Sequence, residues 1–113
     1  MLNRKNVTLY VPVDRDGLEV IFRKFSLKNV SLCSASKGEV CLYVFYDRAK
    51  FFFSGKHIPP FKIREGSFIL LGEVSPSSEA FAFAPPASSM RVTSAEHYVA
   101  GNLNVHHTRL LLK

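Results

Sequence analysis

The chain has 113 residues, a formal net charge of +6 and 47% hydrophobic residues. This length fits one domain over residues 1–113, and the balance of apolar and charged residues excludes a disordered protein. No apolar run reaches membrane-spanning length, no signal-peptide pattern follows the N-terminus, and two cysteines are too few for a disulfide scaffold. We therefore expect a cytoplasmic or nuclear protein with no membrane partner.

The N-terminal third predicts a strand followed by a helix. Apolar and polar residues alternate over residues 7–13, which is typical of a strand with one buried face and would point Tyr10 away from the core. Residues 14–17 have turn composition. Four apolar residues then recur at the spacing i, i+3, i+4 and i+7 of one helix face. They are Leu18, Ile21, Phe22 and Phe25. We expect an amphipathic α-helix here.

The remainder of the chain predicts strands. A strand over residues 30–35, a turn at 36–38 and an apolar central strand at 40–46 follow the helix. Residues 48–53 fit a short helix or a strand. Further strands are expected at 61–64, 68–74, 91–93, 98–105 and 108–112, with a short extended run at 80–84. The predicted fold is α+β: one domain with a mixed or antiparallel sheet, an N-terminal helix and a β-rich C-terminal half.

Two segments resemble the signatures of the RNA-recognition motif. Leu9-Tyr10-Val11 is similar to the start of its first-strand signature, and Tyr43-Val44-Phe45-Tyr46 to the end of its third-strand signature. The similarity covers residues 7–65 as a β-α-β-β-type region and leaves 66–113 as a β-rich extension. It departs from the family at Glu39 and Cys41, where a basic and an aromatic residue are usual. The resemblance implies a sheet on which aromatic side chains stack bases.

The candidate site follows from these tyrosines and the positive charge. Tyr10 and Tyr43 would stand together on an open sheet face and stack bases of single-stranded RNA or DNA. Basic residues around the rim would contact phosphates. These are Lys37, Arg48, Lys50, Lys56, Lys62 and Arg64. In the alternative interpretation, the C-terminal half covers that face and the tyrosines belong to the core.

No pattern in the sequence indicates a catalytic site, a metal or a cofactor. The motifs of serine hydrolases, zinc proteases and phosphate-binding loops do not occur. His106 and His107 are adjacent, so in a strand they would leave opposite faces. Cys33 and Cys41 are expected to be free thiols in neighbouring strands. An enzyme would require His57 to converge with the other two histidines.

Two dense apolar segments suggest self-association. Residues 51–53 are all phenylalanine and residues 110–112 are all leucine, and a small protein has difficulty hiding both. We therefore expect a homodimer or higher oligomer that pairs through strand edges. The alternative function is accordingly a protein-interaction or assembly module, for example a viral accessory or structural subunit.

Overall fold

Every regular element in the described part of the chain is a β-strand. The computed structural model describes residues 3–13, 21–36, 38–72, 81–82, 84–99 and 106–113, and these contain no helix. Nine strands make up one sheet. They are β1 (Asn3–Val13), β2 (Ile21–Ser36), β3 (Glu39–Phe45), β4 (Lys50–Phe53), β5 (Lys56–Ile58), β6 (Phe68–Leu71), β7 (Phe81–Ala82), β8 (Met90–Tyr98) and β9 (His107–Leu112).

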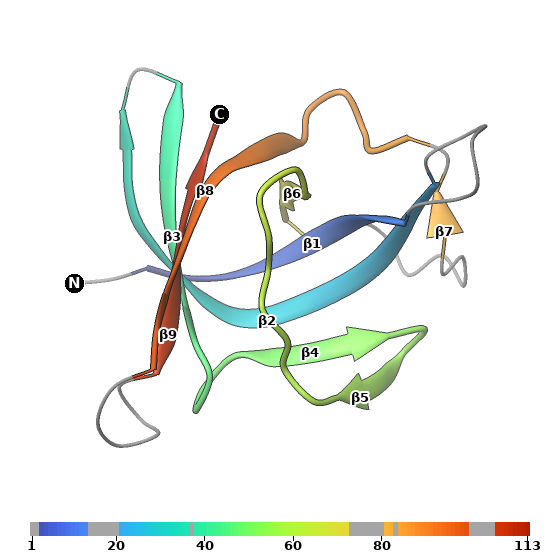
Figure 1. Cartoon of the computed structure of the whole chain (residues 1–113), viewed down its shortest axis with the longest axis horizontal. Coiled ribbons are helices and arrows are strands. Elements are labelled where there is room, and N and C mark those ends of the chain that lie inside the picture. Colours follow the sequence, from blue (N-terminus) through green and yellow to red (C-terminus); the bar gives the residue numbers. More distant parts are fainter. Residues whose placement is uncertain (1–2, 14–20, 37, 73–80, 83, 100–105) are drawn as a thin grey trace.

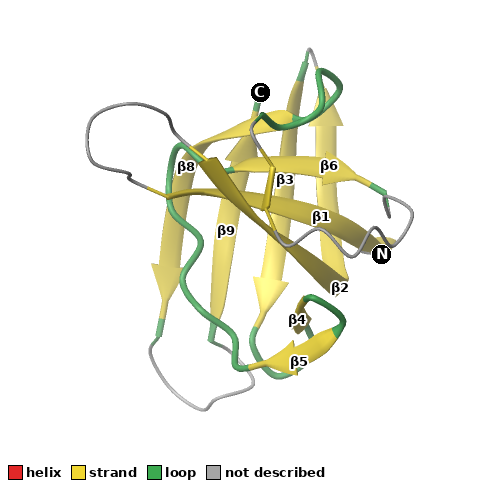
Figure 2. Ribbon diagram, turned by 90° about the vertical axis from the view of Figure 1, so that its right-hand side faces the viewer, coloured by secondary structure: helices red, strands yellow, loops and turns green. Residues whose placement is uncertain are grey.

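Six of the strands close into an antiparallel barrel. The hydrogen-bonded order is β1-β6-β8-β9-β3-β2, and β2 pairs back onto β1. In Figure 2, β8, β9 and β3 lie side by side in the wall of this barrel. Closure pairs the two strands that would be the edges of an open sheet, and β6 meets β8 at two residue pairs, Phe68 with Arg91 and Ile69 with Met90. Around the barrel, the N-terminal strands β3, β2 and β1 are neighbours, and the C-terminal strands β6, β8 and β9 complete the ring.

Side chains fill the barrel interior. Each wall strand alternates, so Leu9, Leu42 and Leu110 point inward and are fully buried. Small barrels have interiors only wide enough for side chains, so this is a packed core and not a channel. Ile63, from the segment between β5 and β6, is buried in the same cluster.

The predicted N-terminal helix is wrong. Ile21, Phe22 and Phe25 belong to β2, while Leu18 and the turn at 14–17 lie outside the described residues. Ile21, Phe25 and Leu27 are buried, and they are separated by even numbers of residues, which a strand also places on one face. Phe22 points the other way and packs edge-on against Phe68, with ring centroids 5.8 Å apart. The β-forming residues and the pairing of β2 with β1 outweigh the helical spacing.

The α+β class is therefore corrected to an all-β barrel in the described residues, and the helices that an RNA-recognition motif carries are not found there. Strands at 7–13, 40–46, 68–74 and 108–112 are confirmed by β1, β3, β6 and β9, with shifted ends. The strand predicted at 30–35 is the second half of β2, and the one predicted at 91–93 lies within β8. The segment 48–53, which fitted a helix or a strand, contains β4. The extended run predicted at 80–84 contains β7. The strand at 61–64 is wrong, because that segment pairs with no strand. Tyr98 ends β8, and residues 100–105 lie outside the description.

The long strand β2 pairs with β3, β4 and β7 along one edge, and it bends between the parts that pair with β3 and β4. Its second half pairs with β3, whereas residues 25–28 pair with β4. Between them Asn29 has a φ of 68°, a conformation that asparagine tolerates better than most residues. The Asn29 N–H donates to Oδ1 of Asn6, where β1 also shifts register. The β4–β5 hairpin consequently extends from β2 outside the ring of barrel strands (Figure 1).

The apolar segments behind the expected oligomer are largely core. Phe51, Leu110 and Leu112 are fully buried. Phe52 and Leu111 are half-buried on the other face of their strands. The homo-oligomer stays a prediction, but these segments no longer supply its apolar surface. Among the described strands, β5 keeps one unpaired edge.

Candidate nucleic-acid interface

Tyr10 does not lie on an open surface. It follows the inward-pointing Leu9 on β1 and therefore faces outward from the barrel, as the alternation predicted, yet only 3% of it is exposed. Burial raises the pKa of its phenol. A base cannot stack on a ring that solvent does not reach, so Tyr10 is unavailable for the predicted role.

Tyr43 also lies far from Tyr10. In the strand register, Tyr43 is opposite Ser31 on β2, and Ser31 is opposite Arg4 on β1. Arg4 precedes Tyr10 by six residues, which is about 20 Å of extended strand. The two tyrosines therefore do not form a common platform. For Tyr10, the structure agrees with the alternative interpretation, in which this tyrosine belongs to the core.

A different aromatic group surrounds Tyr43. Phe45 follows it on the outer face of β3, His107 is opposite Phe45 on β9, and Tyr98 is opposite His107 on β8. The ring centroids are 5.9 Å apart for Tyr43 and Phe45, 5.2 Å for Phe45 and His107, and 4.7 Å for His107 and Tyr98. We call these four residues the aromatic surface.

The aromatic surface is open to solvent. Tyr98 is 44% exposed, and the other three rings are half-buried. The Tyr98 and His107 rings are nearly parallel, at 21°. These rings lie on the outside of the barrel and contribute nothing to the interior packing. Aromatic rings on a surface can pack against another planar ring.

Arg109 and Glu96 lie beside the aromatic surface in the next row of the sheet. Tyr43, Arg109 and Glu96 are opposite one another on β3, β9 and β8. The guanidinium of Arg109 lies 3.6 Å from the Glu96 carboxylate, and the Tyr98 hydroxyl donates to the same carboxylate at 2.5 Å. This hydrogen bond is the main reason that the pKa of Tyr98 is raised. Glu96 thus holds both groups in position.

Basic residues continue from one end of this surface. The Arg48 guanidinium lies over the Phe45 ring, 5.6 Å from its centroid. The Arg48 carbonyl accepts a hydrogen bond from the Asn29 side chain, and next to these residues Lys28 and Lys50 are opposite each other on β2 and β4. All three cations are exposed. We call Lys28, Arg48 and Lys50 the basic strip.

The other basic residues that were predicted to contact phosphates do not belong to the basic strip. Lys56 begins β5, at the far end of the hairpin, and Lys37 is outside the described residues. Lys62 and Arg64 lie on the segment between β5 and β6. The structure therefore brings Arg48 and Lys50 of the predicted set next to the aromatic surface, but it does not bring Lys56, Lys62 or Arg64 there.

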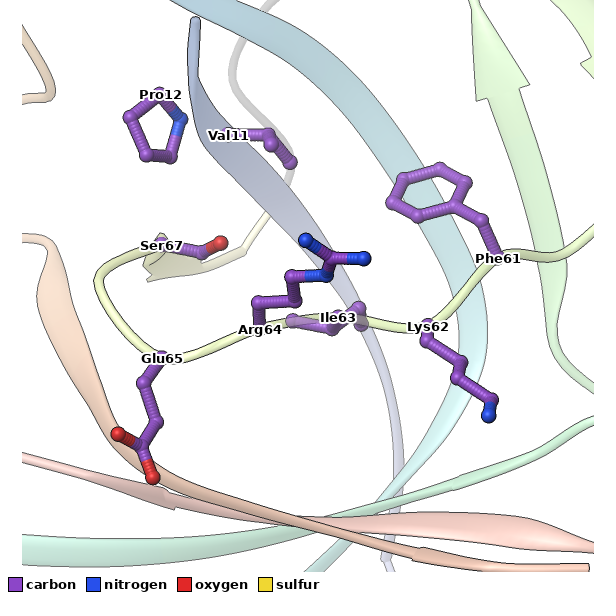
Figure 3. A pocket seen from close by; sticks show the side chains of 8 residues that line it. All are labelled: Val11, Pro12, Phe61, Lys62, Ile63, Arg64, Glu65 and Ser67. Carbon is purple, nitrogen blue, oxygen red and sulfur yellow. The ribbon is translucent and has the colours of Figure 1, made fainter. Parts of the chain in front are cut away.

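Arg64 borders a separate pocket of about 300 Å³. Its guanidinium points between the Phe61 ring and the Ser67 side chain, while Lys62 and Glu65 extend the other way (Figure 3). Val11 and Pro12 of β1 supply apolar walls. Besides these apolar residues, Lys62, Glu65 and Ser67 also line the pocket. The Arg64 guanidinium beside the apolar walls suits a small anionic group on an apolar body. The pocket is on other strands than the aromatic surface.

A polar cluster lies behind the aromatic surface, on the inner side of the same strands. The fully buried Thr108 hydroxyl bonds to the Tyr46 hydroxyl and, at 2.7 Å, to Nδ1 of His97. The pKa of His97 is lowered, first by burial and then by the positive charges of Lys62 and Arg64. A neutral His97 is thus held at the barrel wall. We assign it a structural role.

Three residues of the aromatic surface were not selected as site residues from the sequence. Phe45 was noted only as part of the resemblance, and Tyr98 only as part of a strand. His107 was considered as a metal ligand or catalytic residue, and a structural or surface role was favoured. The pairing of β3 with β9 and of β9 with β8 brings them together, and these pairings join residues more than 50 positions apart for β3 and β9. The alternation of Tyr43 and Phe45 was the one local signal available.

No cofactor or metal site stands out in the described residues. No group of three or more His, Cys, Asp or Glu side chains there could hold a metal ion, and no helix there could cross a bilayer. His57 packs against Phe52 on the β4–β5 hairpin, whereas His107 is on β9, which does not pair with that hairpin. Comparisons with protein-family models, curated proteins and solved structures found no match to this chain.

Proposed function

We propose that this protein binds single-stranded RNA or DNA without catalysis, by stacking bases on the aromatic surface. The single observation that carries the proposal is the run of four rings across β3, β9 and β8, with Tyr98 44% exposed. Each stacked base contributes roughly 1–3 kcal/mol on such platforms, and stacking tolerates any base. Binding with little sequence preference follows from that.

The basic strip supports the same function. A single-stranded nucleic acid with a base stacked on Phe45 would pass its phosphate backbone over Arg48 toward Lys28 and Lys50. The net charge of +6 adds a long-range attraction for phosphates. Contact with about three phosphates would give a logarithmic salt dependence with a slope of about −2, from the value of about −0.7 per contact for single strands.

The test is a titration of fluorescently labelled oligo(dT) and oligo(U) at several salt concentrations. Replacing Tyr98 by alanine removes an exposed ring, and we expect affinity to fall by roughly 5- to 150-fold, which corresponds to 1–3 kcal/mol. Phe81→Ala is the matched control, because Phe81 is 48% exposed but lies on β7, away from the aromatic surface. Absence of binding at low salt, or equal losses in both variants, would refute the proposal.

The alternative of an assembly module has one feature in its favour. Among the described strands, β5 pairs only with β4, and a free edge of this kind can add a strand from another chain. It is short, at three residues, and Lys56 and His57 on it are exposed, which opposes edge pairing. Light scattering across a range of protein concentrations tests it: a particle of 12.7 kDa throughout would exclude self-assembly.

A further inference from the structure

The two cysteines of the chain meet across the β2–β3 hairpin. Ser34 is opposite Cys41 and Leu32 is opposite Leu42, so Cys33 is the extra residue of a bulge. At a β-bulge, two residues of one strand face a single residue of the other. Cys33 and Ser34 therefore both face Cys41.

The spacing of neighbouring antiparallel strands is compatible with a disulfide. Facing residues of an antiparallel pair have Cα atoms about 4.5–5.5 Å apart, within the range of about 4.4–6.8 Å that disulfides span. Both cysteines are free thiols in the structure. The Cys33 thiol is near enough to contribute to the raised pKa of Cys41.

We propose that Cys33 and Cys41 are an oxidation site that forms an intramolecular disulfide by exchange with a low-molecular-weight disulfide such as glutathione disulfide. The two thiols differ in access, and this sets the order of the steps. Cys33 is exposed and meets the oxidant, whereas Cys41 is buried. Cys33 is the attacking residue and Cys41 the resolving one.

The exchange balances in two displacements. The Cys33 thiolate attacks one sulfur of glutathione disulfide, that S–S bond breaks, and one glutathione leaves as its thiolate. The Cys41 thiolate then attacks the Cys33 sulfur of the mixed disulfide and displaces the second glutathione. The cysteines lose two electrons, glutathione disulfide gains them, and the two thiol protons end on the departing glutathiones.

The rate of the second displacement depends on pH. Burial raises the pKa of Cys41, and hydrogen bonding and charge from Arg109 only partly offset this. The fraction of Cys41 present as thiolate rises with pH, so the rate of ring closure rises too. Arg109 also pairs with Glu96, so the oxidation site directly adjoins the row beside the aromatic surface.

The experiment treats the full chain with glutathione disulfide and follows its intact mass and free thiols. The wild type should lose both thiols and retain no glutathione. Cys41→Ser should stop at the first displacement and retain one glutathione on Cys33. Cys33→Ser should stay largely unmodified, because its remaining thiol is buried.

Three results would overturn the proposal. In the first, the wild type keeps glutathione on Cys33. In the second, both wild-type thiols persist although Cys41→Ser is modified. In the third, the disulfide joins two chains. The last is recognised by a doubled mass on a non-reducing gel. A circular dichroism spectrum for each variant establishes that its barrel is folded, so a failure to react reflects thiol geometry. The readout requires no oligonucleotide and is independent of the proposed function.

Discussion

Thr108 is the buried residue at which a small substitution should have a large effect. Its hydroxyl bonds to Tyr46 and to His97, and Thr108 is 0% exposed. Thr108→Val keeps the shape of the side chain but removes this shared partner. An unpaired buried polar group costs about 1–3 kcal/mol. Because Tyr46 and His97 are half-buried and water can reach them in part, we take the lower end, about 2 kcal/mol for the pair.

Urea denaturation followed by circular dichroism measures this loss. With an m-value of about 2 kcal/mol per M, the transition midpoint should fall by about 1 M. Thr93→Val is the matched control, because Thr93 is exposed on β8 and its hydroxyl donates only to the Leu111 carbonyl at 3.2 Å. The control should stay within about 0.5 kcal/mol of the wild type. A Thr108→Val variant as stable as the control would refute the assignment of this cluster.

Three other outcomes are expected. Because the pKa of His97 is lowered, the folded state binds a proton at His97 less readily than the unfolded state does. The free energy of unfolding should therefore fall as the pH drops below about 6.5. Urea unfolding at several pH values should show a less steep fall for His97→Gln than for the wild type. Phe51→Ala should cost about 3–5 kcal/mol and the half-buried Phe52→Ala clearly less; equal losses in thermal denaturation would contradict the register of β4. Glu96→Gln should lower the pKa of Tyr98 in an ultraviolet phenol titration, and an unchanged value would exclude their hydrogen bond.

The strands could be predicted where alternation was strict, and the helix could not be rejected from spacing alone. Val7 and Leu9 alternate with polar residues, and β1 is found there. Ile21 and Phe25 are four residues apart, a separation that places side chains on one face of both a helix and a strand. Only the long-range pairing of β2 with β1 and β4 decides between them.

The sequence indicated that Tyr43 lies on an exposed face of a sheet, but it did not identify the rings that surround Tyr43. Tyr43, Arg48 and Lys50 were selected from local sequence, and they lie at or beside the aromatic surface. Tyr10 failed because burial of an outward-facing side chain depends on what covers the barrel wall, which local alternation does not encode. Tyr98 and His107 are brought to Phe45 by sheet closure, which joins strands that are distant in the chain.

The most direct test of the aromatic surface is an NMR titration of protein labelled with carbon-13 in its aromatic rings, using an unlabelled single-stranded oligonucleotide. Base stacking should shift or broaden the ring signals of Tyr43, Phe45, Tyr98 and His107, and leave Phe81 unchanged. Saturable binding with these four rings unperturbed, or no binding at low salt, would contradict the account.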